Sequence, residues 1–308
     1  MSLAILFSGQ GTQHREMFAL TAQAPEARPV FESAAAALGE DPRDFVREAG
    51  DDALHANRAG QILCVTQALA AFAALAGTLA ETGGTIALAG YSIGELAACA
   101  CAGMIPAAMV LELAGRRAAL MDAAGGPDEG LAFVRGLPRA AVEALCARFG
   151  AATAIVNPGE AFVVGGGRET LRALCAAALA QGAVKAGALK VNVASHTPRL
   201  RAASAGFAQA LAAAGLARPR PDFRLFSGID AARVFTPAQA CERLAAQISQ
   251  TIDWAGCLEA CVESGATRAL EPGPGRALAA MASDVGLDAR GLEDFRTLEG
   301  ARGWLAAG

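Results

Sequence analysis

Short apolar runs alternate along this chain with longer stretches of helical periodicity. Residues 3–7 and 86–90 are two such runs, and each is typical of a buried strand. A helix is expected over residues 94–102, because Gly103 can end it. Strands that alternate with helices indicate an α/β fold with a doubly wound, mainly parallel sheet, similar to the core of α/β-hydrolases.

Residues 125–190 carry a different pattern, in which helices are set among short strands. A Gly-Gly-Pro triplet at 125–127 interrupts the preceding helix. The expected elements are strands at 131–136, 152–156, 161–165 and 184–190, a helix opened by Pro138, and a helix at 168–181. This β-α-β-β-α-β order is the ferredoxin-like arrangement. We therefore predict a small ferredoxin-like subdomain over 125–190, inserted into a large catalytic domain formed by residues 1–124 and 191–308.

Proline and glycine mark the elements beyond residue 190. Thr197-Pro198 and Thr236-Pro237 each combine a favoured N-cap residue with proline at the first helical position, so each is expected to open a helix. The turn Gly273-Pro274-Gly275 separates a strand at 268–271 from a helix that begins near Arg276.

Composition narrows the class of protein. The 308 residues are 54% apolar and carry a formal net charge of −4, which is typical of a globular chain and gives no reason to expect nucleic-acid binding. The most apolar stretch, 62–80, is interrupted by polar residues and is interpreted as a core helix, so no membrane association is expected. The chain start lacks the features of a signal peptide, and the eight cysteines form no C-x-x-C pairs. We expect buried free thiols, no metal site and a cytoplasmic location.

The clearest chemical motif is Gly90-Tyr91-Ser92-Ile93-Gly94, which matches G-x-S-x-G. An apolar strand precedes it and a helix follows it, which is the context that a nucleophile elbow requires. A sharp strand-to-helix turn exposes the Ser92 hydroxyl, and the Ile93 N–H at the positive end of the helix can hold an oxyanion. The alternative is a tight turn with an incidental serine. The motif alone indicates acyl chemistry without specifying the reaction.

Only three histidines are available to activate this serine: His14, His55 and His196. His55 lies in a charged stretch and is expected on the surface, whereas His14 follows a glycine-rich loop and could approach the site. His196 stands at the end of a strand and before a helix, where catalytic residues of doubly wound folds collect. We predict His196 as the base, and the alternative is a packing residue at the start of the helix. Its position well before the C-terminus argues against the ordinary esterase plan.

Arg117 is the candidate for substrate recognition. It lies on the helix that follows Pro106, among apolar residues and close in sequence to the nucleophile. A guanidinium presents a planar pair of donors that matches a carboxylate. The alternative is a surface arginine, which is how we interpret the neighbouring Arg116.

These motifs together resemble the malonyl-CoA:acyl carrier protein transacylase family, which includes the acyltransferase domains of polyketide and fatty-acid synthases. The resemblance runs through nearly the whole chain. Its motifs are Phe7-Ser8-Gly9-Gln10-Gly11-Thr12-Gln13 (family F-P-G-Q-G-x-Q), Gly90 to Glu95 (family G-H-S-x-G-E), Arg117 with Met121, Asn157-Pro158-Gly159, Ser195-His196, Gln247 and Leu270 to Gly275.

The resemblance implies a role for each matching residue. Ser92 would carry the acyl group, and His196 would take and return the proton. Backbone N–H groups of Gln10 and Ile93 would form the oxyanion hole, and the backbone carbonyl of Gln247 would orient His196. Arg117 would pair with the free carboxylate of the malonyl group, and Asn157 would also bind substrate.

The resemblance also implies the reaction partners. Malonyl-CoA would be the donor and an acidic acyl carrier protein the acceptor, with no cofactor beyond the coenzyme A thioester itself. We expect the carrier to dock on the basic residues around the His196 segment, which are Lys185, Lys190, Arg199 and Arg201. Three alternatives remain: the transacylase (epsilon) subunit of a malonate decarboxylase, a serine hydrolase that releases the acyl group to water, and a non-catalytic scaffold that kept the fold, against which the intact Ser92, His196 and Arg117 count.

Three positions depart from the family motifs. Tyr91 replaces the usual histidine before the serine, Ser8 replaces proline, and Glu160 stands where glutamine is common. The change at Tyr91 concerns the acyl-group preference or the local packing, not the nucleophile.

Overall fold

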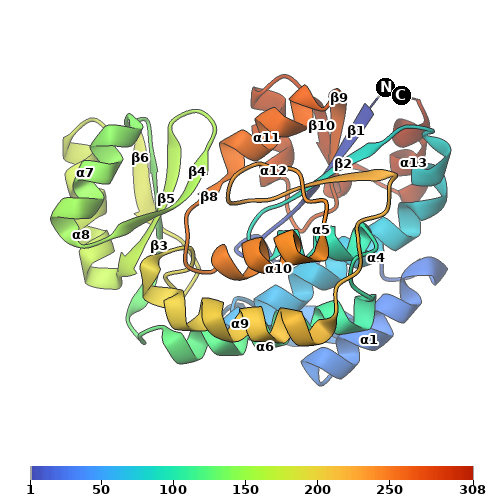
Figure 1. The fold of residues 1–308 in the computed structure, drawn as a ribbon, viewed down its shortest axis with the longest axis horizontal. Coiled ribbons are helices and arrows are strands. Elements are labelled where there is room, and N and C mark those ends of the chain that lie inside the picture. The colour runs from blue at the N-terminus through green and yellow to red at the C-terminus, as the bar shows by residue number, and fades with distance from the viewer. Residues whose placement is uncertain (1, 308) are drawn as a thin grey trace.

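The computed structural model describes residues 2–307 and contains two five-stranded sheets (Figure 1). The first sheet has the order β10-β9-β1-β2-β7, and all four of its strand pairs are parallel. Its strands are β1 (Ser2–Phe7), β2 (Ile86–Gly90), β7 (Phe223–Phe226), β9 (Ala266–Glu271) and β10 (Asp288–Gly291). The predicted strands at 3–7, 86–90 and 268–271 are therefore confirmed.

Helices cover both faces of this sheet. Leu3, Ile5 and Phe7 of β1 belong to one core cluster together with residues of α4 (Asn57–Glu81) and α5 (Gly94–Cys101). The alternate residues Ala4 and Leu6 belong to a second cluster with residues of α11 (Trp254–Glu263) and α12 (Ala277–Asp284). Because successive side chains of a strand point to opposite faces, this division confirms the predicted doubly wound arrangement.

The other helices complete the layer around the first sheet. They are α1 (Arg28–Leu38), α2 (Pro42–Glu48), α3 (Asp51–Leu54), α6 (Ala107–Ala124), α9 (Arg201–Ala214), α10 (Pro237–Ala246) and α13 (Leu298–Ala306), with short 3₁₀ helices at Pro25–Ala27, Pro198–Leu200 and Leu292–Asp294. Within residues 2–307, α4 is the one helix long and apolar enough to span a membrane, but 72% of its most apolar window is buried inside the protein. It is the core helix that the sequence predicted.

The second sheet has the order β6-β3-β5-β4-β8. Its strands are β3 (Glu129–Arg135), β4 (Ala152–Asn157), β5 (Ala161–Gly167), β6 (Lys185–Ala188) and β8 (Ile252–Asp253). With α7 (Arg139–Phe149) after β3 and α8 (Arg168–Ala180) after β5, the element order is the β-α-β-β-α-β order predicted for this region. The domain boundaries at residues 125 and 190 stay a prediction.

One strand of the second sheet comes from a distant part of the chain. β8 pairs in parallel with β4, through Ile155 opposite Ile252 and Val156 opposite Asp253. The sequence pattern did not predict this strand, because it is too short for a periodic signal. β8 therefore connects the two sheets through the chain segment that leads into α11.

The two faces of the second sheet have different neighbours. Ala132, Val134 and Val164 form a separate core cluster with residues of α7 and α8. Leu131, Ile155 and Val163 instead join the cluster that includes α11 and α12. Figure 1 shows α7 and α8 on the outer side of this sheet, away from the first sheet. The inner face of the second sheet is thus packed against the larger unit.

The two predicted Thr-Pro helix starts have different outcomes. Thr236 accepts a hydrogen bond from the Gln239 backbone N–H and forms a capping box with it, so that prediction is confirmed. Thr197 stands at the N-cap of the 3₁₀ helix Pro198–Leu200, with proline at its first position as predicted, but its side chain makes no capping hydrogen bond. Its hydroxyl donates to the Ala194 carbonyl oxygen at 2.7 Å, and a 3₁₀ turn at Pro198–Leu200 precedes α9. The hydroxyl is used to hold the loop that carries His196.

Candidate active site

The nucleophile turn joins β2 to α5 in a space that admits only glycine at its two ends. A Cβ atom at Gly90 would lie 2.1 Å from the Glu95 backbone nitrogen, and one at Gly94 would lie 2.1 Å from the Phe7 carbonyl oxygen. Ser92 between them has a φ of 56°, a left-handed conformation that is rare for a residue with a side chain. The strand, the turn and the helix therefore cross closely, which is the geometry of a nucleophile elbow.

His196 lies against Ser92, as the sequence predicted. Its Nε2 atom is 2.8 Å from the Ser92 hydroxyl oxygen, and its Nδ1 atom hydrogen-bonds to the Gln247 carbonyl oxygen. A carbonyl oxygen only accepts hydrogen bonds, so Nδ1 carries the proton and Nε2 is free to accept the serine proton. The backbone N–H of His196 donates to the Ile248 carbonyl oxygen at 2.8 Å, which holds the stretch of backbone that carries the ring.

The other two histidines lie elsewhere. His14 is paired with Glu293, with 2.9 Å between Nε2 and the carboxylate. His55 hydrogen-bonds through Nδ1 to the Asp51 carbonyl oxygen, and only 10% of its side chain is exposed, so the expectation of a solvated surface residue is wrong. Neither contacts the nucleophile, and the choice of His196 as candidate base agrees with the geometry.

Burial keeps the His196 ring neutral. The loss of solvation, together with the positive charge of Arg117, lowers the pKa of His196 to about 3, and the hydrogen bond to Gln247 opposes this only partly. The ring therefore carries no charge at neutral pH, as a general base must.

Arg117 is buried directly beside the nucleophile, with 2% of the residue exposed. One end of its guanidinium donates to the Gln61 side-chain oxygen at 2.8 Å, and the other donates to the Gln247 side-chain oxygen at 3.1 Å and the Ser92 hydroxyl at 3.4 Å. Burial lowers the pKa of Arg117 to about 10, so the group stays charged at neutral pH. Within residues 2–307 no carboxylate forms an ion pair with it, whereas its neighbour Arg116 is exposed, as expected.

The side chain of Gln247 joins Arg117 to a buried carboxylate. Its amide nitrogen donates to Glu95 at 2.7 Å and to the Ser92 carbonyl oxygen at 3.3 Å, while its amide oxygen faces Arg117. Glu95 also accepts from the Gly228 N–H at 3.1 Å, and burial raises the pKa of Glu95 to about 7. Gln247 therefore contributes both its backbone, to His196, and its side chain, to Arg117.

Two members of this network, Gln61 and Glu95, were not assigned a role from the sequence. Both are polar residues next to or within apolar helical stretches, α4 and α5 respectively, and both are buried. A buried polar side chain needs a hydrogen-bond partner, and that requirement is the signal that could have pointed to them. Their partners lie 56 and 152 residues away in the chain, so the pairing itself is not readable from local pattern.

The loop that carries Gln10 passes over the nucleophile turn. A Cβ atom at Gly9 would lie 2.8 Å from the Tyr91 carbonyl oxygen and 3.5 Å from the Ser92 Cβ atom. The Gln10 side chain donates to the Asn57 carbonyl oxygen at 3.1 Å, which holds the loop in this position. Ile93 is fully buried at the start of α5. Both predicted oxyanion-hole residues are thus neighbours of Ser92.

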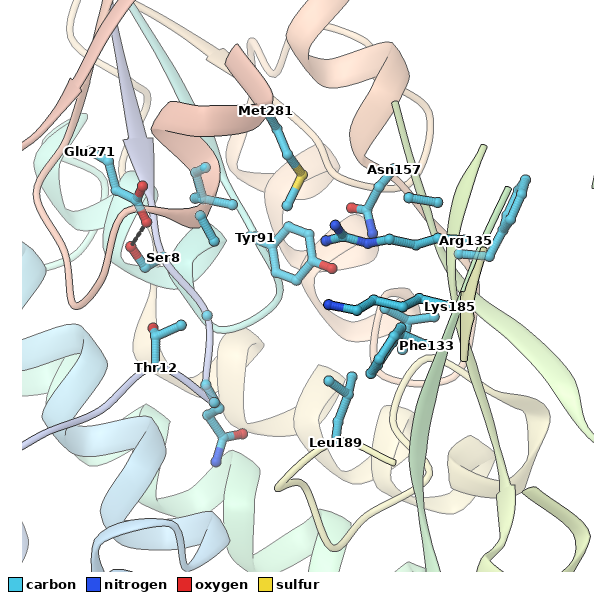
Figure 2. Close-up of a pocket in the computed structure, with 18 residues that line it drawn as sticks. Ser8, Thr12, Tyr91, Phe133, Arg135, Asn157, Lys185, Leu189, Glu271 and Met281 are labelled. Atoms are coloured by element: carbon cyan, nitrogen blue, oxygen red, sulfur yellow. Dashed lines mark hydrogen bonds between the residues drawn. The ribbon is translucent and has the colours of Figure 1, made fainter. Parts of the chain in front are cut away.

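Ser8 and Glu271 support the same loop. The Ser8 hydroxyl donates to Glu271 at 2.7 Å, and the other carboxylate oxygen of Glu271 accepts from the Ala279 N–H at 2.8 Å (Figure 2). Burial raises the pKa of Glu271 to about 7. The departure from the family motif at Ser8 therefore has a structural consequence, because proline has no hydroxyl to offer this carboxylate.

A cavity of about 390 Å³ lies beside the nucleophile turn, between the two sheets. Gly9, Gln10 and Tyr91 line this cavity, and Gly9 and Tyr91 lie next to Ser92. Figure 2 shows residues of the second sheet, among them Phe133 and Arg135, across the cavity from Ser8 and Thr12. Asn157, at the end of β4, also lines the cavity with 9% of the residue exposed, and its side-chain oxygen has no hydrogen-bond partner within residues 2–307.

The tyrosine that replaces the family histidine packs into the cavity wall. The Tyr91 ring meets Trp254 edge-on, with 5.4 Å between ring centroids. Burial raises the pKa of Tyr91 to about 12, against smaller lowering effects of Asn157 and Arg135. The hydroxyl points into the cavity toward the second sheet (Figure 2).

The eight cysteines are free, and all but Cys241 are buried. Over residues 2–307, no group of three or more His, Cys, Asp or Glu side chains is placed to hold a metal ion.

Comparison with known proteins identifies a family and relatives for this chain. Residues 5–269 match the family model described as "Acyl transferase domain". The chain belongs to this family. A curated relative of this acyl transferase, the malonyl CoA-acyl carrier protein transacylase of Mycobacterium tuberculosis, is 30% identical over 91% of this chain and 92% of its own length. The Salmonella typhimurium protein of the same name is 28% identical over 92% of each chain.

Solved structures show that the acyl transferase fold is shared over the whole chain. The acyl-carrier-protein S-malonyltransferase of Burkholderia pseudomallei superposes with a TM-score of 0.89 at 28% identity, over 98% of this chain and 100% of that one. A malonyl-transacylase solved in complex with a type II polyketide synthase acyl-carrier protein gives a TM-score of 0.88 at 25% identity, over 99% of each chain.

Proposed function

We propose that this acyl transferase moves a malonyl group from coenzyme A to the phosphopantetheine thiol of an acyl carrier protein, through an acyl-enzyme on Ser92. The observation that carries the proposal is the buried guanidinium of Arg117, which lies 3.4 Å from the Ser92 hydroxyl and has no carboxylate partner within residues 2–307. A charge held in this way is stabilised by an acyl group that brings its own carboxylate. The relatives named as malonyl CoA-acyl carrier protein transacylases support the same donor and acceptor.

The first half of the reaction acylates the serine. As the Ser92 oxygen attacks the thioester carbonyl, His196 takes its proton at Nε2. The carbonyl oxygen becomes an oxyanion, which the backbone N–H groups of Gln10 and Ile93 would stabilise. When the intermediate collapses, the C–S bond breaks and the coenzyme A sulfur takes the proton from His196.

The second half repeats these steps in reverse order with the carrier thiol. The thiol gives its proton to His196 as its sulfur attacks the acyl-enzyme, and Ser92 recovers its proton when the ester bond breaks. Atoms and protons balance, and no group beyond the chain and its two thiols is required. We therefore propose coenzyme A thioesters as substrates and no separate cofactor.

The malonyl carboxylate has a second effect in this site. Burial is the larger cause of the low His196 pKa of about 3, and the charge of Arg117 lowers this pKa further. A carboxylate bound to Arg117 would offset that charge and raise the pKa of His196. A malonyl donor would thus improve its own base, whereas an acetyl donor would not.

The carrier protein is expected to dock near the mouth of the cavity. The four basic residues predicted to bind it differ in whether their charge is already paired. Lys190 pairs with Asp51 at 2.8 Å, and Arg199 pairs with Glu129 at 2.8 Å, so part of their charge is compensated. Arg201 is exposed, and Lys185 lines the cavity. The eight free thiols agree with a reducing compartment, and we propose a cytoplasmic location.

Intact-protein mass spectrometry after incubation with malonyl-CoA tests the proposal. We expect a stable gain of one malonyl group on Ser92 in the wild-type protein and none in Ser92→Ala. Addition of a carrier protein with its phosphopantetheine arm should remove the adduct. Release of free malonate without an adduct would instead identify a hydrolase, and an adduct on another residue would exclude Ser92 as the nucleophile.

A further inference from the structure

Glu95 is a buried carboxylate three positions after the nucleophile. It lies in the first turn of α5 with 2% of the residue exposed, and within residues 2–307 it forms no ion pair. A buried carboxylate costs free energy unless hydrogen bonds or a cation hold it. The steps of the proposed reaction do not use this side chain, so its burial beside the nucleophile needs another explanation.

One oxygen of Glu95 connects two distant segments of the chain. Its Oε2 atom accepts from the Gln247 side-chain nitrogen at 2.7 Å and from the Gly228 backbone N–H at 3.1 Å. A Cβ atom at position 228 would lie 2.9 Å from this oxygen, so glycine leaves room for it. Both partners donate, and the atom that they share therefore has to be an acceptor.

The bond to Glu95 fixes how the Gln247 amide is turned. The amide nitrogen faces Oε2 of Glu95, and the amide oxygen consequently faces Arg117 at 3.1 Å. The opposite orientation would set donor against donor at the guanidinium and acceptor against acceptor at Glu95. Without Glu95 the amide nitrogen would keep only its longer bond, of 3.3 Å, to the Ser92 carbonyl oxygen. Glu95 is thus the main partner that holds this nitrogen.

The same link reaches the guanidinium nitrogen that contacts the nucleophile. Nη2 of Arg117 donates both to the Gln247 side-chain oxygen and to the Ser92 hydroxyl. Burial lowers the pKa of Arg117, and the charge of Glu95 opposes this effect, so the two groups also interact electrostatically. A continuous chain of polar groups therefore runs from Glu95 through Gln247 to Arg117.

We infer that Glu95 is a positioning residue for selection of the acyl group: it holds the Gln247 amide, which in turn holds the Arg117 guanidinium where the free carboxylate of the acyl group binds. The inference rests on the proposed function. Glu95 acts through Gln247 and needs no contact with the substrate. Loss of the acceptor at Glu95 should therefore weaken transfer of a carboxylated acyl group more than transfer of an acetyl group.

Two substitutions separate the acceptor from the charge. Glu95→Leu removes the acceptor at similar volume. Glu95→Gln removes the charge but keeps the acceptor, because the Gly228 N–H requires an oxygen at that place. The hydroxyl of nearby Ser227 can accept a hydrogen bond from the new amide nitrogen.

We would measure kcat/KM for malonyl-CoA and acetyl-CoA with the wild type and both variants. The malonyl-to-acetyl ratio should fall about tenfold or more in Glu95→Leu, because a hydrogen bond that holds a charged group is lost, and should stay within about threefold of the wild type in Glu95→Gln. Glu112→Leu, which removes an exposed carboxylate of α6, is the control and should leave the ratio unchanged. Should Glu95→Leu fail to fold, Glu95→Ala removes the same acceptor and carries the same expectation.

Each other outcome overturns the inference. Equal losses with the two donors in Glu95→Leu show that the residue supports the fold and not the selection. A ratio in Glu95→Gln that changes as much as in Glu95→Leu, or that rises, shows that the charge acts and not the acceptor. An equal change in Glu112→Leu shows a general effect of lost negative charge. A wild type that forms no malonyl adduct contradicts the proposed function itself, which is a separate result from all of these.

Discussion

Arg117 and Arg135 lie in opposite surroundings. Arg117 is almost completely buried, and two glutamine oxygens hold its guanidinium. Arg135 is exposed, stands next to a lysine, and has no carboxylate partner within residues 2–307. A buried charge has to be held by fixed polar groups because water cannot solvate it, whereas water and salt screen an exposed one.

This difference shows which of the two arginines is held in a fixed position by hydrogen bonds. One of the two glutamines that hold Arg117, Gln247, also holds His196 and contacts the Ser92 backbone. The inner region is therefore one connected network, in which moving one group disturbs the others. Arg135 takes no part in this network.

The largest effect is expected from the centre of the inner network. His196→Ala should slow acylation of Ser92 by about 10³-fold or more, because the serine loses its proton acceptor. His14→Ala removes a histidine that is paired with Glu293 outside the site, and should change the rate little. Stopped-assay rates of both variants with malonyl-CoA make the comparison. A greater loss in His14→Ala would reverse the assignment of the base.

A smaller effect sharpens the comparison, because Glu271 lines the cavity and yet is buried. Its folded pKa of about 7 lies above its ordinary value of 4.5, so the folded state binds the proton more tightly. The associated stability is present below pH 4.5 and is lost as the pH rises through 7. Glutamine does not titrate, so the stability of Glu271→Gln does not change with pH at this position. The wild type should therefore lose about 2–3 kcal/mol relative to Glu271→Gln between pH 5 and pH 8.

Urea unfolding of the two proteins at both pH values measures this difference. Glu263→Gln, which changes an exposed carboxylate at the end of α11, serves as the matched control and should follow the wild type. Parallel pH dependence of wild type and Glu271→Gln would show that burial does not raise the pKa of this carboxyl. The expectation that burial raises the free-energy cost of an ionised side chain would then fail for Glu271.

The sequence predicted the parts of the site that local pattern encodes. The Gly90 and Gly94 positions mark the elbow because no other residue fits there, and His196 could be chosen because only three histidines exist. The parts it did not predict depend on distant segments. Glu95 is held by Gln247 across 152 residues, and Arg135 meets Lys185 only when β3 and β6 pair.

A similar limit explains why β8 was not predicted. This strand is two residues long and is defined by its pairing with β4, which no periodicity reveals. Thr197 is a different case, because its hydroxyl bonds to the carbonyl oxygen of Ala194, three residues earlier, and does not cap the helix that follows. There a competing local hydrogen bond, not a distant contact, uses the side chain.

The central claim is that Arg117 selects a carboxylated acyl group, and one ratio tests it most directly. We would measure kcat/KM for malonyl-CoA and acetyl-CoA with the wild type, Arg117→Ala, and the exposed neighbour Arg116→Ala as control. Removing one member of a buried charge pair typically costs about 2–5 kcal/mol. Malonyl transfer should therefore fall by about thirtyfold or more in Arg117→Ala, while acetyl transfer holds or improves, and Arg116→Ala should behave as the wild type. A malonyl-to-acetyl ratio that is the same in Arg117→Ala as in the wild type would contradict the carboxylate-binding role and the proposed substrate with it.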